Sequence, residues 1–257
     1  YGGRNLGSSQ VLAVTAMQSN CGDCKRASSC IGLGVSKENI AKAVNLTARK
    51  QLLHKADRLF SAGDQINNLY LVHSGVLKTY RITPEGDRQV IGFYFADQII
   101  NLDSLYDGKS TVFAEALNTA SVCAVSIAEF KNALSLSPEL QDGFVRRMSK
   151  MIRQQTDHTV SVGICDATQR MARTLYRISK HYRTMGYSQL WFELPMSRVD
   201  IASYLGLAIE TVSRQIRKLC QLGIVKITRN KVEILAMDKL MICALVDEQA
   251  TEFREVA

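Results

Sequence analysis

The pattern of hydrophobic and polar residues changes once along the chain. Between residues 51 and about 130, short runs rich in β-branched and aromatic residues, such as Leu69 to Val72 and Val90 to Phe95, are separated by glycines. Thr83 to Asp87 contains Pro and Gly and predicts a turn between two such runs. Short strands at regular spacing are typical of a small sandwich or barrel, so we expect a β-rich domain in this region.

Helical patterns surround the β-rich region. A long helix is expected to begin at Pro138, because Pro is favoured in a first turn, and to run to about Val162. Residues 1–35 are rich in Gly, Ser and Cys and show no clear period. The other expected elements are a helix over 36–50 with Ser36 as its cap, a helix over 169–185, a strand from Trp191 to Leu194, two helices on either side of Gly206, and a hairpin formed by 224–228 and 231–235.

The composition of the 257 residues is that of a globular protein, with 46% hydrophobic and 22% charged residues. The apolar run from Val11 to Met17 is too short to cross a bilayer, and no small-residue cleavage site follows it, so neither a membrane protein nor a secretion signal is expected. Seven cysteines are an odd number, which argues against a disulfide framework and for a reducing compartment. We therefore expect a cytoplasmic protein.

The net charge of +8 is concentrated in one quarter of the chain. Residues 168–235 contain twelve Lys and Arg but four Asp and Glu, a net charge of +8, so the remainder of the chain is neutral overall. A localised basic domain favours a partner with a phosphate backbone. A solvated basic surface without such a partner is the alternative.

The segment from Ser197 to Leu219 has the pattern of a helix-turn-helix, with Gly206 at the tight turn. The apolar residues whose spacing packs the two helices together are Ile201, Leu205, Ile209, Val212, Ile216 and Leu219. The residues expected to point outward near the start of the second helix are Glu210, Ser213, Arg214 and Arg217. Arg can bridge guanine O6 and N7, Glu can accept from cytosine N4, and Ser can contact a base edge or a phosphate. The segment therefore predicts binding of double-stranded DNA, with the following hairpin as a wing, whereas a helical hairpin with a solvated charged face is the alternative.

The long helix carries a heptad pattern that predicts a dimer interface. The residues of this seam, spaced by three and four, are Val145, Met148, Ile152, Gln155, Thr159 and Val162. Gln155 and Thr159 are polar and lie near its centre, so the seam is expected to be marginal alone and dimerisation to be conditional. The alternative is an ordinary amphipathic helix packed on its own β-rich domain.

Three cysteines, Cys21, Cys24 and Cys30, form a C-x2-C-x5-C pattern in the amino-terminal segment. Thiolates this close together are suited to metal or iron–sulfur ligation, but three ligands need a fourth, and Cys123 lies in the strand-rich region. Structural zinc sites usually pair two close knuckles, so the spacing favours iron–sulfur ligation while zinc and unligated thiols stay open. The remaining cysteines, expected to be buried thiols in helical contexts, are Cys165, Cys220 and Cys243.

The order of these parts resembles the CRP/FNR superfamily of bacterial transcription regulators over nearly the full length. C-G-D-C-K-R-A-S-S-C at 21–30, Cys123, and I-E-T-V-S-R at 209–214 are similar to the oxygen-sensing FNR subgroup in particular. The resemblance implies an α+β fold. Its four parts are a cysteine-rich iron–sulfur ligand segment at 1–35, a β-roll of the cyclic-nucleotide-binding type (a jelly roll) at 36–137, a dimerisation helix at 138–164, and a winged helix-turn-helix DNA-binding domain at 165–257.

The resemblance also implies the cofactor, the partners and the response. A [4Fe–4S] cluster is expected on Cys21, Cys24, Cys30 and Cys123, in a homodimer that binds a promoter site similar to TTGAT-N4-ATCAA and activates or represses anaerobic metabolism genes. Within the recognition helix, the positions that read the half-site in the family are Glu210, Ser213 and Arg214. Oxygen is expected to convert the cluster to [2Fe–2S] and to release the dimer. Surface loops of the β-roll, such as Pro84 to Asp87, are candidates for contact with RNA polymerase. Members of the family carry an acidic residue near the position of Gln155. With Gln155 in its place, the charge repulsion between protomers that disfavours a dimer without the cluster is expected to be missing.

Three alternatives stand beside this function: a cyclic-nucleotide-responsive regulator of the same superfamily, an enzyme, and a constitutive DNA-binding protein. A cyclic-nucleotide-responsive regulator needs a Gly-Glu pair and, further on, an Arg beside Ser or Thr, but the matching stretches 96–102 and 109–112 contain no Arg, so no cyclic nucleotide is expected. An enzyme is not expected, because the C-x2-C pattern opens no helix, no dinucleotide fingerprint is present, and the four His are scattered. The third alternative is a constitutive DNA-binding protein with zinc or free thiols at the cysteines.

Overall fold

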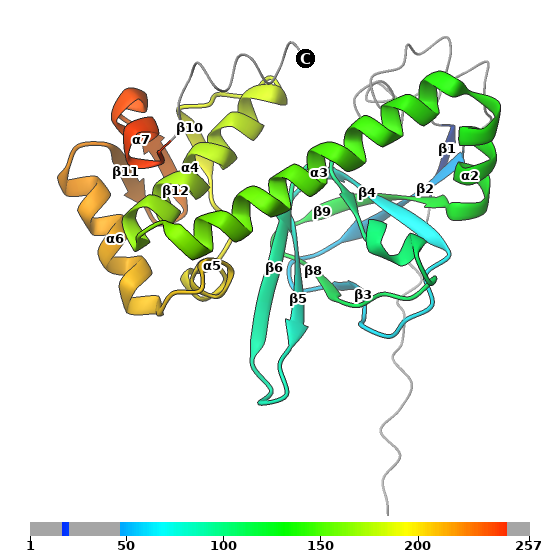
Figure 1. Cartoon of the computed structure of the whole chain (residues 1–257), viewed down its shortest axis with the longest axis horizontal. Helices are drawn as coiled ribbons and strands as arrows, with labels where there is room; N and C mark the ends of the chain where they lie inside the picture. Colours follow the sequence, from blue (N-terminus) through cyan, green and yellow to red (C-terminus); the bar gives the residue numbers. More distant parts are fainter. Residues whose placement is uncertain (1–16, 21–46, 246–257) are drawn as a thin grey trace, which may run out of the picture.

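The protein, represented here by a computed structural model, has a mixed α+β architecture (Figure 1). The structure describes residues 17–20 and 47–245. A β-roll lies at one end, a single long helix, α3 (Pro138–Ile164), crosses the molecule, and a helical domain with a small sheet lies at the other end. Across the described ranges, no helix is both long and apolar enough to span a membrane.

The β-roll consists of two antiparallel sheets. The five-stranded sheet has the order β1-β2-β9-β4-β7, and the four-stranded sheet has the order β3-β8-β5-β6. The strands are β1 (Met17–Asn20), β2 (Thr47–Leu53), β3 (Arg58–Phe60), β4 (Asn68–Ser74), β5 (Leu77–Ile82), β6 (Arg88–Tyr94), β7 (Ile99–Ile100), β8 (Phe113–Ala116) and β9 (Ala120–Ser126), with a 3-10 turn η2 (Leu102–Leu105) after β7. The β5–β6 hairpin projects from the roll and ends in the turn at residues 83–87 (Figure 1).

Strand β9 is packed on both faces. Because neighbouring residues of a strand point to opposite faces, Val122 lies in one apolar cluster with Leu77, to which both sheets contribute, whereas Cys123 lies in a second cluster. Helix α2 (Ile127–Leu136) and the first half of α3 contribute to the second cluster, where the rings of Phe130 and Phe144 meet edge to face at 5.2 Å. The side chain of Cys123 therefore lies on the face of the roll that α2 and α3 cover.

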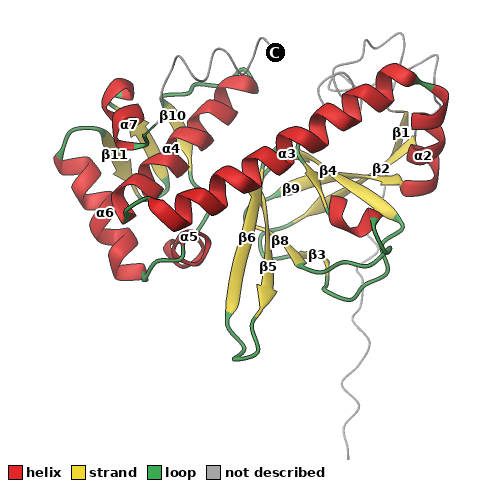
Figure 2. Ribbon diagram, in the orientation of Figure 1, coloured by secondary structure: helices red, strands yellow, loops and turns green. Residues whose placement is uncertain are grey.

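The carboxy-terminal domain is a winged helix-turn-helix, seen on the left of Figure 2. Its small antiparallel sheet has the order β10-β12-β11. The elements are α4 (Ala167–Thr184), β10 (Trp191–Glu193), α5 (Arg198–Leu205), α6 (Ile209–Gln221), β11 (Val225–Thr228), β12 (Lys231–Ile234) and α7 (Met237–Cys243). The apolar core of this domain is continuous with a patch of the β-roll that includes Tyr80, Val90 and Phe95, so the two domains pack directly against each other.

Most of the elements expected from the sequence are confirmed, including the strands, the long helix, the helix pair around Gly206 and the hairpin after it. The helix expected over 36–50 is wrong at residues 47–50, which belong to β2, while residues 36–46 lie outside the described part. Pairing of β2 with both β1 and β9 overrides the local pattern. Two elements are not predicted from the sequence. Strand β1 lies in a segment without a hydrophobic period, and α2 is missed although the Ser126 hydroxyl caps it by accepting from the Glu129 N–H.

Candidate nucleic-acid interface and cysteine site

The helix-turn-helix is formed by α5 and α6. Helix α5 begins at a capping box, in which the Ser197 hydroxyl accepts from the Asp200 N–H and the Asp200 carboxylate accepts from the Ser197 N–H. It ends at Gly206, which has a φ of 63°, a left-handed conformation that favours glycine, so that the chain turns sharply into α6. The two helices are joined by buried residues that the sequence pattern identifies: Ile201, Leu205, Val212, Ile216 and Leu219.

The outer face of α6 is open to solvent. Glu210, Arg214 and Arg217 are exposed, and Ser213 is partly buried. Ile209 is expected from the sequence to pack between the helices, and this expectation is wrong: Ile209 is 42% exposed, because it is the first residue of α6 and precedes the packed face. An exposed aliphatic side chain at this end of the helix is suited to contact with a thymine methyl group.

Helix α6 is held on α4 by polar contacts that the sequence analysis did not identify. The Thr168 hydroxyl donates to Oε1 of the buried Gln215 at 2.8 Å, and Lys218 Nζ donates to the same hydroxyl at 3.2 Å. The guanidinium of Arg170 donates to the Leu205 carbonyl at 3.0 Å, which joins α4 to the end of α5. These bonds fix the recognition helix relative to the chain that emerges from α3.

The wing is the β11–β12 hairpin. Arg229 lies at its tip with a φ of 57°, and Lys226 and Lys231 are exposed on the strands beside it. Lys231 Nζ lies 5.3 Å from the centre of the Trp191 ring on the neighbouring strand β10. Three cations therefore extend from a supported sheet next to α6, as binding to a phosphate backbone requires.

The structure describes one of the four cysteines expected to bind a cluster. Cys123 is 8% exposed on β9, and Cys21, Cys24 and Cys30 lie outside the described residues. Residues in register on neighbouring strands point to the same face, so Lys50 of β2 and Leu71 of β4 flank Cys123. Cys165 is buried, and Cys220 and Cys243 are partly buried, in the carboxy-terminal half.

The stretch that corresponds to a cyclic-phosphate pocket contains both apolar and polar side chains. Asn101 adopts a left-handed conformation with a φ of 71°, and the next residue, Leu102, is buried in the apolar cluster where a Glu would be needed. The Thr111 hydroxyl donates to the Asp103 carboxylate at 2.8 Å and accepts from the Arg81 guanidinium at 2.9 Å, so an arginine from β5 lies beside Thr111 although the stretch itself contains none.

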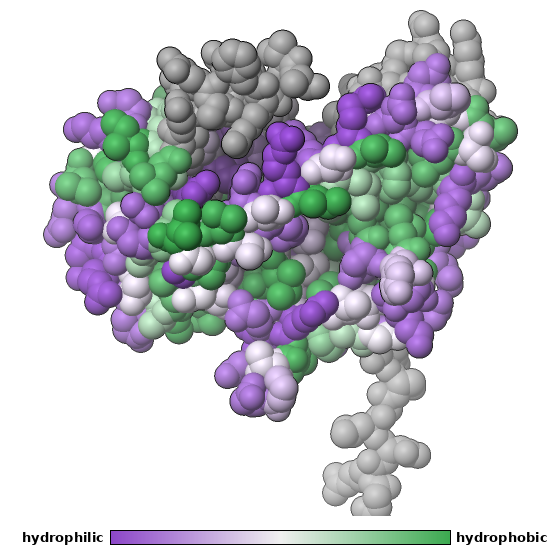
Figure 3. All heavy atoms as spheres, in the orientation of Figure 1, coloured by the Kyte–Doolittle hydropathy of each residue, from purple (hydrophilic) through white to green (hydrophobic). Residues whose placement is uncertain are grey.

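The solvent-facing side of α3 carries apolar residues. Val145 is 56% exposed and Ile152 is 63% exposed, and Gln155 and Thr159 of the expected seam also face solvent. Met148 and Val162 are partly buried, and Met148 packs on the apolar cluster of the roll. Two further residues, Val160 and Ile164, are exposed apolar side chains outside the expected seam. Figure 3 shows the hydrophobic patches that interrupt the polar surface along the line of α3.

Near its carboxyl end, α3 contacts α5 through two stacked rings. The His158 ring lies parallel to the Tyr204 ring, with centres 4.1 Å apart, and the Arg177 guanidinium from α4 donates to the Tyr204 hydroxyl. Burial and, next, the nearby Arg177 charge lower the pKa of His158 to about 4, so the ring is neutral at pH 7. The sequence offers no signal for this contact, because the three residues come from three different helices.

Comparison with known proteins agrees with this architecture. A model of the Crp-like helix-turn-helix domain matches residues 169–242, and a model of the cyclic nucleotide-binding domain matches residues 50–137. The fumarate and nitrate reduction regulatory proteins of Salmonella typhimurium and Escherichia coli are each 31% identical to the chain over 221 residues, which are 86% of this chain and 88% of theirs.

Solved structures share the fold. FixK2 from Bradyrhizobium japonicum superposes with a TM-score of 0.70 at 24% identity, over 76% of this chain and 96% of that chain. A CRP/FNR family transcriptional regulator from Thermus thermophilus gives a TM-score of 0.60 at 18% identity, over 76% of this chain and 98% of that chain. With the 31% identity over most of both chains, these likenesses show that the chain belongs to the CRP/FNR family of DNA-binding transcription regulators, which are not enzymes, and within it to the subgroup of the fumarate and nitrate reduction regulators.

Proposed function

We propose that this chain is an oxygen-responsive transcription regulator. Cys21, Cys24, Cys30 and Cys123 bind a [4Fe–4S] cluster, two protomers associate along α3, and the dimer binds a palindromic promoter site similar to TTGAT-N4-ATCAA to activate or repress genes. The boundaries at residues 35, 137 and 164 then divide the chain into ligand segment, sensing roll, dimer helix and DNA-binding domain.

The observation that carries the proposal is the strand register around Cys123. Met17 of β1 pairs with Lys50 of β2, and Lys50 pairs with Cys123 of β9. Two strand spacings separate the backbones of Met17 and Cys123, which is about 10 Å. Strand β1 ends at Asn20, which pairs with Thr47 and lies about 10 Å along the strand from Met17, and Cys21 is the next residue in the sequence. The register brings the amino-terminal strand to within two strands of Cys123, and the ten residues from Cys21 to Cys30 are long enough to span the remaining distance, which supports ligation by cysteines about 100 residues apart in sequence.

The surroundings of Cys123 fit an iron–sulfur group. Its thiol faces the apolar cluster under α2 and α3, where solvent is largely excluded. Lys50 pairs in register with Cys123 on the neighbouring strand, so the two side chains lie on the same face of the sheet. When bound, a [4Fe–4S] cluster supplies an oxygen-labile covalent tie between the amino-terminal segment and β9.

Helix α3 is the element through which the chain transmits the state of this tie. Phe144, Met148 and Met151 of α3 pack on the cluster of apolar residues that contains Cys123. An adjacent, exposed side of the same helix carries Val145 and Ile152, which a second protomer would bury. A change in packing at Cys123 therefore acts on the helix that holds the dimer together. Because the polar residue Gln155 weakens the seam, a free-energy change of about a few kcal/mol is enough to shift the equilibrium between monomer and dimer.

At the other end, Glu210, Ser213, Arg214 and Arg217 read the half-site, and the wing cations contact the backbone. Charged and hydroxyl groups at these positions match the donors and acceptors that base edges present in the major groove.

The exposed hairpin tip at residues 84–87 is the proposed contact for RNA polymerase, since it projects from the roll away from its core (Figure 1).

The test is anaerobic purification of the full-length chain, followed by iron and sulfide assay, visible absorbance, and operator binding before and after exposure to air. We expect stoichiometric iron and sulfide, and tight binding that air abolishes. Cys123→Ala should lose iron and operator binding, whereas the matched buried control Cys165→Ala should keep both.

Other outcomes assign the protein to a different regulator of the same family. A colourless protein with stoichiometric zinc, or a Cys123→Ala variant that binds the operator as tightly as the parent under anoxia, rules out the cluster. Saturable binding of cyclic AMP in a calorimetric titration contradicts the expectation that no cyclic nucleotide binds.

A further inference from the structure

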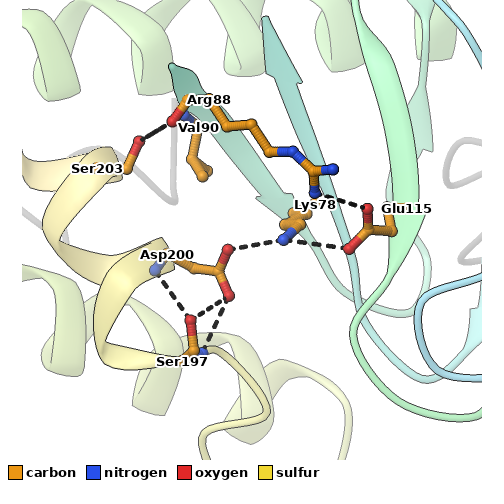
Figure 4. Close-up of polar contacts among 7 residues, drawn as sticks. All are labelled: Lys78, Arg88, Val90, Glu115, Ser197, Asp200 and Ser203. Carbon is orange, nitrogen blue, oxygen red and sulfur yellow. Dashed lines mark hydrogen bonds and ion pairs between the residues drawn. The ribbon is translucent and has the colours of Figure 1, made fainter. Parts of the chain in front are cut away.

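The DNA-binding domain touches the β-roll through α5, the first helix of the helix-turn-helix. The contact is with β5 and β6, and β6 is the last strand of its sheet. We call this contact the α5 dock and define it by Lys78, Val90, Asp200 and Ser203 (Figure 4). None of these residues belongs to the base-reading positions of α6, so the family function does not account for them.

The first part of the dock is a buried group of charges. Lys78 Nζ of β5 lies 2.7 Å from Asp200 Oδ1 of α5 and 3.2 Å from Glu115 Oε1 of β8, and Lys78 is 8% exposed. Removing one partner of a buried ion pair leaves an uncompensated charge, so separation of the domains is costly at this point. The other oxygen of Asp200 accepts from the Ser197 hydroxyl at 2.6 Å, and the same carboxylate thus caps α5 and joins it to the roll (Figure 4).

The charges of this group are maintained at neutral pH. Burial alone would lower the pKa of Lys78, but the Asp200 and Glu115 carboxylates outweigh it and raise that pKa above its usual value. Burial opposes ionisation of Asp200, but hydrogen bonds from Lys78 and Ser197 outweigh it and lower its pKa. The dock is therefore not a sensor of pH in the neutral range.

The second part of the dock is a set of hydrogen bonds to the free edge of β6. The Val90 N–H donates to Ser203 Oγ at 2.8 Å, and Ser203 Oγ donates to the Arg88 carbonyl at 3.0 Å. The Gln89 side-chain amide donates to the Ser203 carbonyl at 2.6 Å. A strand edge needs partners for its backbone groups, and here α5 provides them in place of another strand.

Aromatic packing continues the contact toward α3. The rings of Phe93 on β6 and Tyr204 on α5 have centres 5.0 Å apart, and the Tyr204 ring also stacks on His158 of α3. Helix α5 is thus restrained by the roll on one side and by the dimer helix on the other.

We propose that the α5 dock sets the orientation of the helix-turn-helix relative to the β-roll and α3, and that Lys78 and Ser203 are positioning residues for DNA binding. The dock leaves the reading face uncovered, since Glu210, Arg214 and Arg217 stay exposed while α5 is docked. It therefore orients the domain and does not block it. The two recognition helices of a dimer must fit half-sites at a defined separation. A fixed orientation of each helix-turn-helix therefore determines which half-site spacing the dimer prefers, as well as how tightly it binds.

The test uses the full-length chain purified under anoxia and two readouts. Hydrogen exchange at the Val90 amide reports whether α5 is docked, because its acceptor is the Ser203 hydroxyl. The second readout is the ratio of affinities for a palindromic operator and for the same operator with one base pair inserted between the half-sites. The variants are Lys78→Met and the smaller change Ser203→Ala, which keeps the helix and its cap.

We expect exchange at Val90 to become about tenfold faster in Ser203→Ala, as one lost hydrogen bond predicts, and more than that in Lys78→Met. The spacing ratio should fall several-fold in both variants. Arg81→Gln is the matched control: Arg81 is exposed on the same hairpin and its guanidinium donates to the Thr111 hydroxyl at 2.9 Å within the β-roll, so both readouts should equal those of the parent.

Three results overturn the proposal. They are an unprotected Val90 amide in the parent chain, faster exchange with an unchanged spacing ratio, and a gain in operator affinity when the dock is broken, which would make it an inhibitory contact. The inference relies on the family's DNA binding but not on the iron–sulfur cluster, because exchange at Val90 is measured whether or not the preparation contains iron.

Discussion

The two ends of α3 are built on different principles. At the DNA-binding end, short helices are defined by caps, a glycine turn and exposed charges, and residues within about 25 positions of one another determine the motif. At the β-roll end, Cys123 lies on a central strand whose neighbours come from residues 47–53 and 68–74, and residues 17–20 pair with the first of these strands. The comparison teaches that the DNA-binding motif is local in sequence, whereas the proposed cysteine site depends on long-range strand pairing.

The largest loss of stability is expected from a substitution in the apolar core at the β-roll end. Phe130→Ala removes a ring that is 1% exposed and packs on Phe144 in the apolar cluster of Cys123. The variant should lose about 3–5 kcal/mol of unfolding free energy in chemical denaturation, because it leaves a cavity. Leu136→Ala, at an exposed position of the same helix, is the control and should change little. An equally stable Phe130→Ala protein would show that the cluster does not hold α2 and α3 on the roll.

At the DNA-binding end, the same kind of truncation should affect binding without affecting stability. Arg214 is exposed and its guanidinium donates to the Thr211 hydroxyl in its own helix at 3.3 Å, so Arg214→Ala leaves the core intact. Loss of a base contact predicts a cost of about 1–3 kcal/mol in operator affinity, with relaxed preference at one base pair. Fluorescence anisotropy with base-substituted operators measures both. Arg183→Ala, an exposed cation on α4 far from α6 in sequence, is the control for charge alone.

The junction between the two ends should respond to acid. His158 has a pKa near 4 in the folded protein and an ordinary value of 6.5 when unfolded, so protonation favours the unfolded chain. Stability is complete above pH 6.5 and falls as the pH decreases toward 4. For this partly buried ring we expect about 1 kcal/mol lost between pH 7.5 and 5, measured by urea denaturation.

His158→Phe keeps a ring to stack on Tyr204 and cannot titrate. Its stability should therefore decrease less than that of the parent over the same pH interval. A parallel decrease in both proteins would mean that other groups cause the acid sensitivity and that the His158 ring is not held in its neutral form.

The smallest effect is expected at the dimer seam, where two substitutions test which residues of α3 form the interface. Gln155→Ile should raise the dimer fraction in sedimentation by replacing a polar residue with an apolar one at the expected interface. Thr156→Ile tests the neighbouring line of exposed residues that includes Ile152 and Val160. If only Thr156→Ile strengthens the dimer, the interface follows the exposed apolar side chains and the heptad register is wrong; if neither does, α3 is not the interface.

Elements with local sequence signals are predicted correctly, whereas elements that depend on long-range packing are not. Helices α3, α5 and α6 are predictable, since Pro138, the Ser197 cap and Gly206 are local signals and buried residues recur with the helical period. The misassigned residues 47–50 belong to a strand that pairs on both sides, and Ile209 is apolar but lies before the packed face. In both cases the elements packed nearby decide the conformation or burial of the residue, and the local sequence pattern does not.

The sequence by itself determined that a basic helix-turn-helix follows a long helix and a β-rich domain, and that three cysteines lie close together at the amino-terminal end. Periodicity, caps and charge depend on nearby residues, so one chain is enough to identify them. Only the tertiary structure decided that Lys50 lies beside Cys123, that His158 stacks on Tyr204, and that Lys78 binds Asp200 across 122 positions of sequence. The physical reason is that an ion pair, a ring stack or a strand register is set by which elements pack together, and no local period along the chain encodes that choice.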